Sequence, residues 1–273
     1  MLQESLENVR TKAPMVHCIT NYVTANDVAN MILACGGKPI MADDSNEVEE
    51  ITALSQGLNL NIGTLQQRTV VSMLTAGRRA NELKHPVLLD PVGVGASRWR
   101  MEMAANLMKE IRFDMIRGNM SEIKSLLGVG KGSGGVDALG ADAVTEQNVG
   151  DAIAFAKEAA EKLGCVLAIT GAIDLVTDGK SCYVLRGGRA EMSHVTGTGC
   201  QLSGMMTAFL AANPENMLQA AVSAVCVMNV AGEVAWEQLR PEEGNATYRN
   251  RIIDAVYRMD GELLERRANY EVR

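Results

Sequence analysis

The segment 195–204 contains the residues best suited to chemistry. It reads Val-Thr-Gly-Thr-Gly-Cys-Gln-Leu-Ser-Gly, and an apolar run typical of a helix begins near Gln201. A glycine-rich turn entering a helix exposes backbone N–H groups at the positive end of the helix dipole, where anions bind. Gly197 and Gly199 are expected to form such an anion hole, although close packing against a neighbouring helix also explains them. Cys200 falls in the first helical turn, where we expect the dipole to lower the thiol pKa.

A second polar group, Asn119-Met-Ser-Glu122, stands where another helix is expected to begin. A carboxylate at this point can hold Mg²⁺ directly or through water, because Mg²⁺ keeps several waters and bridges to phosphates. Helix capping, with Glu122 near the third helical position, is the plainer interpretation of the same spacing. Asp90 follows an apolar run and is a second acidic candidate for a magnesium site.

The hydrophobic pattern indicates the strands and helices that must position these residues. Short apolar runs alternate with longer amphipathic ones along the chain. This alternation predicts an α/β fold of βαβ units around a mostly parallel sheet. The runs 175–176 and 182–185 flank Thr177-Asp-Gly179 and predict a hairpin at the sheet edge. The expected strands are 16–20, 38–41, 58–62, 86–89, 113–116 and 165–169, and the expected helices are 25–33, 47–56, 68–83, 99–111, 121–127, 147–162, 201–212, 215–238 and 247–267.

Polar and small residues follow these strands, and open parallel sheets bind ligands at the carboxyl ends of their strands. They are Asn21, 41–43, Gly63–Thr64, 90–93, 117–119 and Thr170–Gly171. Ordinary turn formation accounts for about half of these positions, since Gly, Asn and Asp favour turns. It accounts poorly for Arg117, whose guanidinium can clamp phosphate oxygens with two hydrogen bonds. A surface salt bridge is the alternative role for this arginine.

The composition of the chain indicates which partners are excluded and which cellular compartment is expected. The chain has 273 residues, with 33 acidic against 26 basic side chains and a net charge of −7, which argues against nucleic acid and anionic membranes as partners. Its six cysteines include no Cys-x-x-Cys pair and indicate buried thiols in a reducing compartment. No signal peptide and no apolar run of 18 residues is found, so we expect a cytoplasmic protein.

The sequence supports neither of two common nucleotide-binding motifs. No Walker A motif is present, and Gly130-Lys-Gly-Ser-Gly-Gly135 matches Gly-x-Gly-x-x-Gly only in spacing. That segment follows a predicted helix, whereas the dinucleotide motif follows a strand. We therefore expect a flexible surface loop there.

Taken together, the glycine turn and the upstream Asn-x-x-Glu resemble the ribokinase-like superfamily of small-molecule kinases. In their order along the chain, several segments resemble the hydroxyethylthiazole kinase family of thiamine salvage. The resemblance extends to residue 204, about three quarters of the chain. It implies one three-layer α-β-α domain over residues 1–273, ATP as co-substrate with Mg²⁺, and a homotrimer with sites at subunit interfaces. The matching segments are 16–24, 39–42, 60–64, 89–96, 116–119, 135–137, 168–171 and 195–200.

The resemblance also implies roles for individual residues. The catalytic position is Cys200, which is usually Asp in the wider superfamily. Asp43-Asp44-Ser45 replaces the family's common single acidic residue after Met-Ala, so the charge at the pocket rim differs. The implied substrate-pocket residues are Met41, Asn21, Gly63 and Gly197, the implied ATP contacts are Arg117, Thr170, Asn119 and Gly199, and the implied acidic residues near Mg²⁺ are Glu122 and Asp90.

The implied reaction transfers the γ-phosphoryl group of ATP to the primary hydroxyl of 4-methyl-5-(2-hydroxyethyl)thiazole. Catalysis of such a transfer is mostly positioning and charge stabilisation, with Cys200 accepting or orienting the hydroxyl proton. Three alternatives stay open on the residues alone. They are a kinase of the same fold for another alcohol, such as hydroxymethylpyrimidine or a sugar, a transferase or hydrolase with Cys200 as nucleophile and His17 as its base, and a non-catalytic ligand-binding protein.

Overall fold

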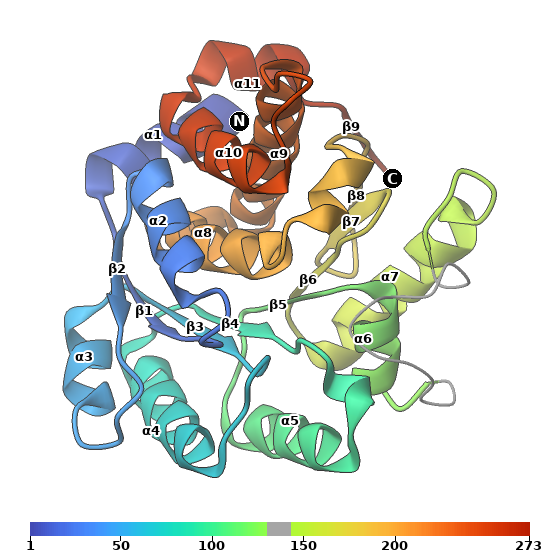
Figure 1. The fold of residues 1–273 in the computed structure, drawn as a ribbon. Helices are drawn as coiled ribbons and strands as arrows, with labels where there is room; N and C mark the ends of the chain where they lie inside the picture. Colours follow the sequence, from blue (N-terminus) through green and yellow to red (C-terminus); the bar gives the residue numbers. More distant parts are fainter. Residues whose placement is uncertain (130–142) are drawn as a thin grey trace.

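The computed structural model describes residues 1–129 and 143–273 (Figure 1). Its central sheet has the strand order β2-β1-β3-β4-β5-β6-β7-β8-β9. Strands β1 to β6 pair in parallel, and β7, β8 and β9 pair antiparallel. The strands are β1 (Met15–Ile19), β2 (Lys38–Met41), β3 (Gly57–Asn61), β4 (Val87–Asp90), β5 (Met115–Gly118), β6 (Val166–Ile169), β7 (Asp174–Thr177), β8 (Cys182–Leu185) and β9 (Tyr270–Val272).

Helices cover both faces of this sheet (Figure 1). Helices α3 to α7 pack on one face, and α1, α2 and α8 to α11 pack on the other, each over its own apolar core. The expected three-layer α-β-α fold with a mostly parallel sheet is confirmed. The helices are α1 (Leu2–Lys12), α2 (Ala25–Cys35), α3 (Val48–Leu54), α4 (Gln67–Leu83), α5 (Arg98–Glu110), α6 (Met120–Leu126), α7 (Val149–Leu163), α8 (Thr198–Ala212), α9 (Met217–Glu237), α10 (Asn245–Arg258) and α11 (Gly261–Arg267).

Two expectations near the carboxyl terminus are wrong. The hairpin β7–β8 forms, but β9 pairs with β8, so the hairpin is not at the sheet edge. A strand of three residues is too short for its alternation to stand out in the sequence. The helix expected over 247–267 is two helices, because the Asp260 side chain accepts a hydrogen bond from the Leu263 N–H at 2.7 Å and caps a new one.

Other expectations concern the cysteines, the membrane and the glycine loop. The six cysteines are free, and only Cys165 is not fully buried. Within the described residues, one helical segment, Pro214–Glu237, has the length and apolarity to cross a membrane, but 67% of its apolar window is buried inside the protein. The glycine-rich segment 130–135 lies outside the described residues.

The strand order creates a switch point between β1 and β3. Successive strands add on opposite sides of β1, since β2 pairs with one edge of it and β3 with the other. In open α/β sheets, ligands bind in the crevice at the carboxyl ends of the strands where the order reverses. Helix α8 contacts β1, β3 and β4, so its first turn stands beside this crevice.

Candidate active site

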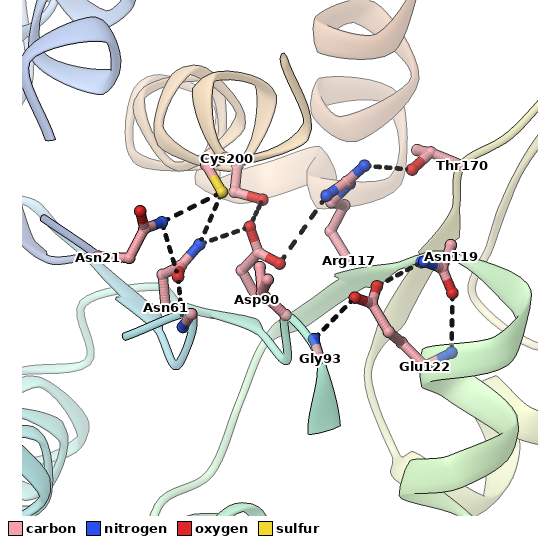
Figure 2. Close-up of polar contacts among 12 residues, drawn as sticks. Asn21, Asn61, Asp90, Gly93, Arg117, Asn119, Glu122, Thr170 and Cys200 are labelled. Atoms are coloured by element: carbon pink, nitrogen blue, oxygen red, sulfur yellow. Dashed lines mark hydrogen bonds and ion pairs between the residues drawn. The ribbon is translucent and has the colours of Figure 1, made fainter. Parts of the chain in front are cut away.

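Three polar side chains at the carboxyl ends of β1, β3 and β4 gather around Cys200 (Figure 2). The side-chain amides of Asn21 and Asn61 donate hydrogen bonds to the Cys200 Sγ, at 3.3 and 3.2 Å. Asn61 Nδ2 also donates to Asp90 Oδ2 at 2.9 Å. All four residues are buried. The structure therefore brings the predicted Cys200, Asn21 and Asp90 into one cluster, and it adds Asn61.

The thiol of Cys200 is not activated by its place at the helix start. Burial, and secondly the negative charge of Asp90, raise its pKa to about 11, and Arg117 and the Asn61 amide oppose this only in part. The expectation that the helix dipole lowers this pKa is therefore wrong. Loss of hydration outweighs the partial charge of the dipole. At neutral pH Cys200 is a neutral thiol.

Arg117 links this cluster to a second region of the site (Figure 2). Its guanidinium lies 3.8 Å from Asp90 Oδ1 and donates a hydrogen bond to the Thr170 hydroxyl. A Cβ added at Gly199 would overlap the guanidinium, so only glycine lets the first turn of α8 approach it. The Arg117 side chain is 12% exposed, which excludes a surface salt bridge. A partly buried cation thus lies directly beside the helix start.

A pocket of about 640 Å³ opens on the other side of Arg117. This volume is within the usual range for small-molecule and cofactor sites. The four residues expected to contact ATP all line it, namely Arg117, Asn119, Thr170 and Gly199. The predicted nucleotide residues are therefore brought together, whereas Cys200 and its asparagine partners lie beyond Arg117.

Sequence reasoning missed the far wall of this pocket. Asp174 lines it and is held from two sides, by the Gly171 N–H at 2.9 Å and by Asn229 Nδ2 at 2.8 Å. Burial raises the pKa of Asp174. The sequence does hold a signal for this pocket wall. Asn229 is a lone polar residue in an apolar stretch of α9, and Gly187-Gly188 follow β8. These residues share the wall with Met192 and Met228.

The Asn119–Glu122 segment forms the capping box that was the plainer interpretation. Asn119 Oδ1 accepts the Glu122 N–H, and Glu122 Oε2 accepts the Asn119 N–H, both at 2.8 Å. Glu122 Oε1 accepts the Gly93 N–H at 2.9 Å. The carboxylate thus ties the start of α6 to the loop after β4. Burial, and secondly the nearby Asp90 charge, raise the pKa of Glu122.

These two carboxylates suit a magnesium ion that keeps water ligands. Asp90 Oδ1 is buried and accepts no hydrogen bond, and its ion pair with Arg117, at 3.8 Å, leaves room for a further ligand. Each Glu122 oxygen accepts a single backbone hydrogen bond and retains a lone pair for water. Among the described residues no cluster of three or more His, Cys, Asp or Glu side chains forms a metal cage. Mg²⁺ bound through one or two carboxylates, waters and phosphates fits this arrangement.

The residues expected in the substrate pocket are only partly gathered. Gly63 lies against Asn21, because a Cβ added at Gly63 would lie 3.0 Å from Asn21 Cβ. Gly197 adopts a φ of 81° and packs on Thr24, where a Cβ would overlap the threonine side chain. Met41 is farther out, on the edge strand β2, and is 39% exposed.

The extra acidic residues after Met41 have local partners. Asp43 pairs with Arg68 at 3.3 Å, and Asp44 Oδ1 accepts hydrogen bonds from the backbone and side chain of Asn46, both at 2.9 Å. The ion pair offsets the charge of Asp43, whereas the neutral Asn46 amides orient Asp44 and leave its negative charge in place.

Arg100 on α5 fastens two of the strand-end loops to each other. Its guanidinium donates to the carbonyls of Ile62 at 2.7 Å and Val92 at 3.0 Å, and also to the carbonyl of Gly63. One loop follows β3 and the other follows β4. A single side chain therefore sets the distance between the loops that carry Gly63 and Gly93.

Replacing Arg100 with methionine is expected to lower kcat/KM for the alcohol substrate by about tenfold, since displacing substrate-positioning groups by 1 Å can cost up to about a hundredfold. Methionine keeps the apolar stem but donates no hydrogen bond. Steady-state kinetics with a thermal melt would measure this. Arg98→Met is the matched control, because Arg98 starts the same helix, is exposed and pairs with exposed Glu102. Equal effects from both variants would contradict the role of Arg100.

A partly buried cation at a helix start, with a nucleotide-sized pocket on one side and a polar cluster at the switch point of a mostly parallel sheet on the other, defines a fold and site typical of small-molecule kinases. Solved structures agree on the fold. Pyridoxal kinase from Staphylococcus aureus, 15% identical, superposes with a TM-score of 0.61 over 95% of this chain and 97% of that chain. A ribokinase-like superfamily protein from Enterococcus faecalis, 11% identical, also gives 0.61, over 92% and 88% of the two chains.

The chain belongs to the hydroxyethylthiazole kinase family, whose model matches residues 6–262. It is 53% identical over 272 residues to hydroxyethylthiazole kinase from Clostridium acetobutylicum, covering 99% of both chains. It is 46% identical to the enzyme of that name from Desulfovibrio desulfuricans, covering 97% and 95% of the two. The structure of hydroxyethylthiazole kinase protein from Pyrococcus horikoshii superposes with a TM-score of 0.88 at 32% identity, over 100% and 98% of the chains.

Proposed function

We propose that this protein phosphorylates the hydroxyl of 4-methyl-5-(2-hydroxyethyl)thiazole with ATP, in thiamine biosynthesis or salvage. One observation carries the proposal furthest. Arg117 separates a nucleotide-sized pocket from the Cys200 cluster, so that a γ-phosphate and an acceptor hydroxyl would meet at the first turn of α8. Membership of the hydroxyethylthiazole kinase family supports the choice of alcohol.

Each part of the site has a task in this transfer. The N–H groups of the first turn of α8 lack partners within the helix and would hold the phosphoryl oxygens. Arg117 would add positive charge beside them, and the thiolate form of Cys200 would take the hydroxyl proton late in a loose transition state. Asp90 and Glu122 would hold Mg²⁺, which supplies neutralisation of the phosphate charge when bound. Asn119 and Thr170 would orient the nucleotide, and Met41, Gly63, Asn21 and Gly197 would contact the thiazole alcohol.

The alternative of a cysteine nucleophile is not favoured. It requires a base beside the thiol. In the described part of the chain, the side chains hydrogen-bonded to this thiol are the amides of Asn21 and Asn61 and the hydroxyl of Thr24, none of which is a base. His17 is buried and engaged elsewhere, with its ring nitrogens 2.9 Å from Thr52 Oγ1 and from the Ala42 carbonyl. The same position for Cys200 suits a proton acceptor in phosphoryl transfer.

The proposal also covers the oligomeric state of the enzyme and its cellular location. Tyr22 and Val23, which follow Asn21 in the chain, are 73% and 59% exposed, and Met41 on the edge strand β2 is 39% exposed; exposed apolar residues are typical of an interface. This supports a homotrimer with sites at subunit interfaces, built from one kinase domain over residues 1–273. Six free cysteines support a reducing, cytoplasmic setting.

A turnover assay with ATP, Mg²⁺ and a panel of alcohols tests the function. We expect hydroxyethylthiazole to exceed hydroxymethylpyrimidine and ribose in kcat/KM, because Met41 and Gly63 offer few hydrogen bonds to a polyol. Apolar pockets discriminate modestly, so the preference over near isosteres is expected to be about tenfold to a few hundredfold. A higher kcat/KM for ribose or the pyrimidine in direct competition would overturn the choice of substrate.

A further inference from the structure

Asn61 uses both ends of its amide to join the other members of the Cys200 cluster. Its Nδ2 donates to Asp90 Oδ2 at 2.9 Å and to Cys200 Sγ at 3.2 Å. Its Oδ1 accepts from Asn21 Nδ2 at 3.1 Å and from the Gly63 N–H at 2.9 Å. The side chain is 2% exposed, and Figure 2 shows it between the thiol and the aspartate.

The orientation of this amide follows from its partners. A backbone N–H can only donate, so the Gly63 contact places the carbonyl end of Asn61 on that side. The NH₂ end must then face Asp90 and Cys200. Because Asn61 and Asn21 both donate to Cys200 Sγ, lone pairs of the sulfur face the two amides. The S–H bond, and in the thiolate the lone pair that replaces it and can accept a proton, consequently points away from the asparagine pair.

We propose that Asn61 is a positioning residue that sets the direction of the Cys200 S–H bond and holds the thiol at a fixed distance from Asp90. This inference rests on the proposed phosphoryl transfer. Without Asn61 the thiol would rotate about its Cα–Cβ and Cβ–Sγ bonds. Asp90 would keep only the Ser203 hydroxyl, at 2.8 Å, and the distant Arg117 as partners. Both effects would remove the proton acceptor from its place without changing the nucleotide pocket.

The test compares Asn61→Ala with Asn59→Ala. Asn59 lies two residues earlier on the same face of β3, is fully buried, and places its amide nitrogen 3.9 Å from the thiol of Cys18, outside the cluster. We expect Asn61→Ala to lower kcat by about 10- to 100-fold, the loss of one or two buried hydrogen bonds, with KM for ATP within threefold of the parent. Asn59→Ala should keep kcat within threefold, whatever its thermal stability.

A double-mutant cycle separates positioning from a general structural role. If Asn61 acts through Cys200, its replacement should cost at least fivefold less in a Cys200→Ala background than in the parent. Asn61→Asp gives a second route if the alanine variant unfolds, since it keeps the volume and the acceptor oxygen but turns an oxygen toward Asp90. It should lose at least as much kcat as Asn61→Ala.

Three outcomes would overturn the inference. They are a kcat of Asn61→Ala or Asn61→Asp within threefold of the parent, an equal loss in Asn59→Ala, and full additivity in the cycle. Failure of the proposed function is separate, because it shows as absent thiazole turnover by the parent enzyme. The variants would then be compared on the alcohol that the parent does use.

Discussion

Alanine at position 200 is expected to lower kcat by about 10²- to 10⁴-fold, the usual contribution of a positioned proton acceptor. ATP binding should persist, because Cys200 lies outside the nucleotide pocket, beyond Arg117. Steady-state kinetics and equilibrium binding of ATP to the same preparation measure the two effects. A variant that retained kcat within a few-fold would leave the α8 backbone and Arg117 as the main catalysts.

The kcat of the parent enzyme is expected to depend on pH through the ionisation of the Cys200 thiol. A thiol with a pKa of about 11 is almost fully protonated at pH 7, and its thiolate fraction rises tenfold per pH unit below that pKa. We therefore expect the kcat of the parent to rise with pH between 7 and 10. Cys200→Asp should keep substantial activity with a flat profile in this range, because a carboxyl group of ordinary pKa near 4 is already ionised.

Chemical modification distinguishes the acceptor from a nucleophile. Alkylation should inactivate the parent, with ATP or the thiazole protecting it, and should spare Cys200→Asp. An inert Asp variant, together with a phospho- or acyl-cysteine trapped at position 200 and seen by mass spectrometry, would favour covalent catalysis instead. Identical pH profiles for the parent and the Asp variant would remove the thiolate from the mechanism.

Arg117→Ala is expected to lower kcat/KM for ATP by about tenfold to a hundredfold. A charge-assisted hydrogen bond to a phosphate contributes roughly 1.5–3 kcal/mol. The guanidinium is also the cation nearest the buried Asp90 carboxylate, whose pKa is raised by burial and held down by Arg117. Kinetics at varied ATP concentration, with a thermal melt, would measure both the loss and the intactness of the fold.

Two further variants test whether the expected loss is specific to the guanidinium of Arg117. Arg117→Lys keeps the charge but lacks the planar fork, so an intermediate loss is expected. Arg112→Ala removes an arginine just before the same strand, where it is 68% exposed and pairs with Asp114, and should leave ATP use unchanged. An unchanged kcat/KM in a normally folded Arg117→Ala enzyme would return Arg117 to a purely structural role.

Several local features could be predicted from the sequence because they depend on neighbours along the chain. Apolar periodicity located β1 to β6, with β5 expected two residues too early, and Asn21 after β1 and Arg117 near the end of β5 both reach the Cys200 and Asp90 cluster. The glycine turn before α8 was recognisable because Gly197 and Gly199 permit a tight helix entry. The spacing of Asn119 and Glu122 likewise predicted the capping box.

Other features depend on contacts between distant parts of the chain. Asn61 reads as an ordinary strand residue, and only folding brings it to Cys200, 139 residues away. The pocket wall containing Asp174 and Asn229 is assembled in the same way. The β9 strand has too few residues to carry a pattern of its own, and it forms because β8 offers a free edge.

The sequence by itself determined the order of the elements from β1 to α9, the carboxyl ends of the parallel strands as the place of the site, and the residue types present there, but it did not show α1 or β9. Only the tertiary structure decided the protonation state of Cys200. The helix start would favour a thiolate, but burial of the side chain and the approach of Asp90 raise the pKa to about 11. The physical reason is that hydration and charge at one atom depend on everything packed around it, which no local motif records.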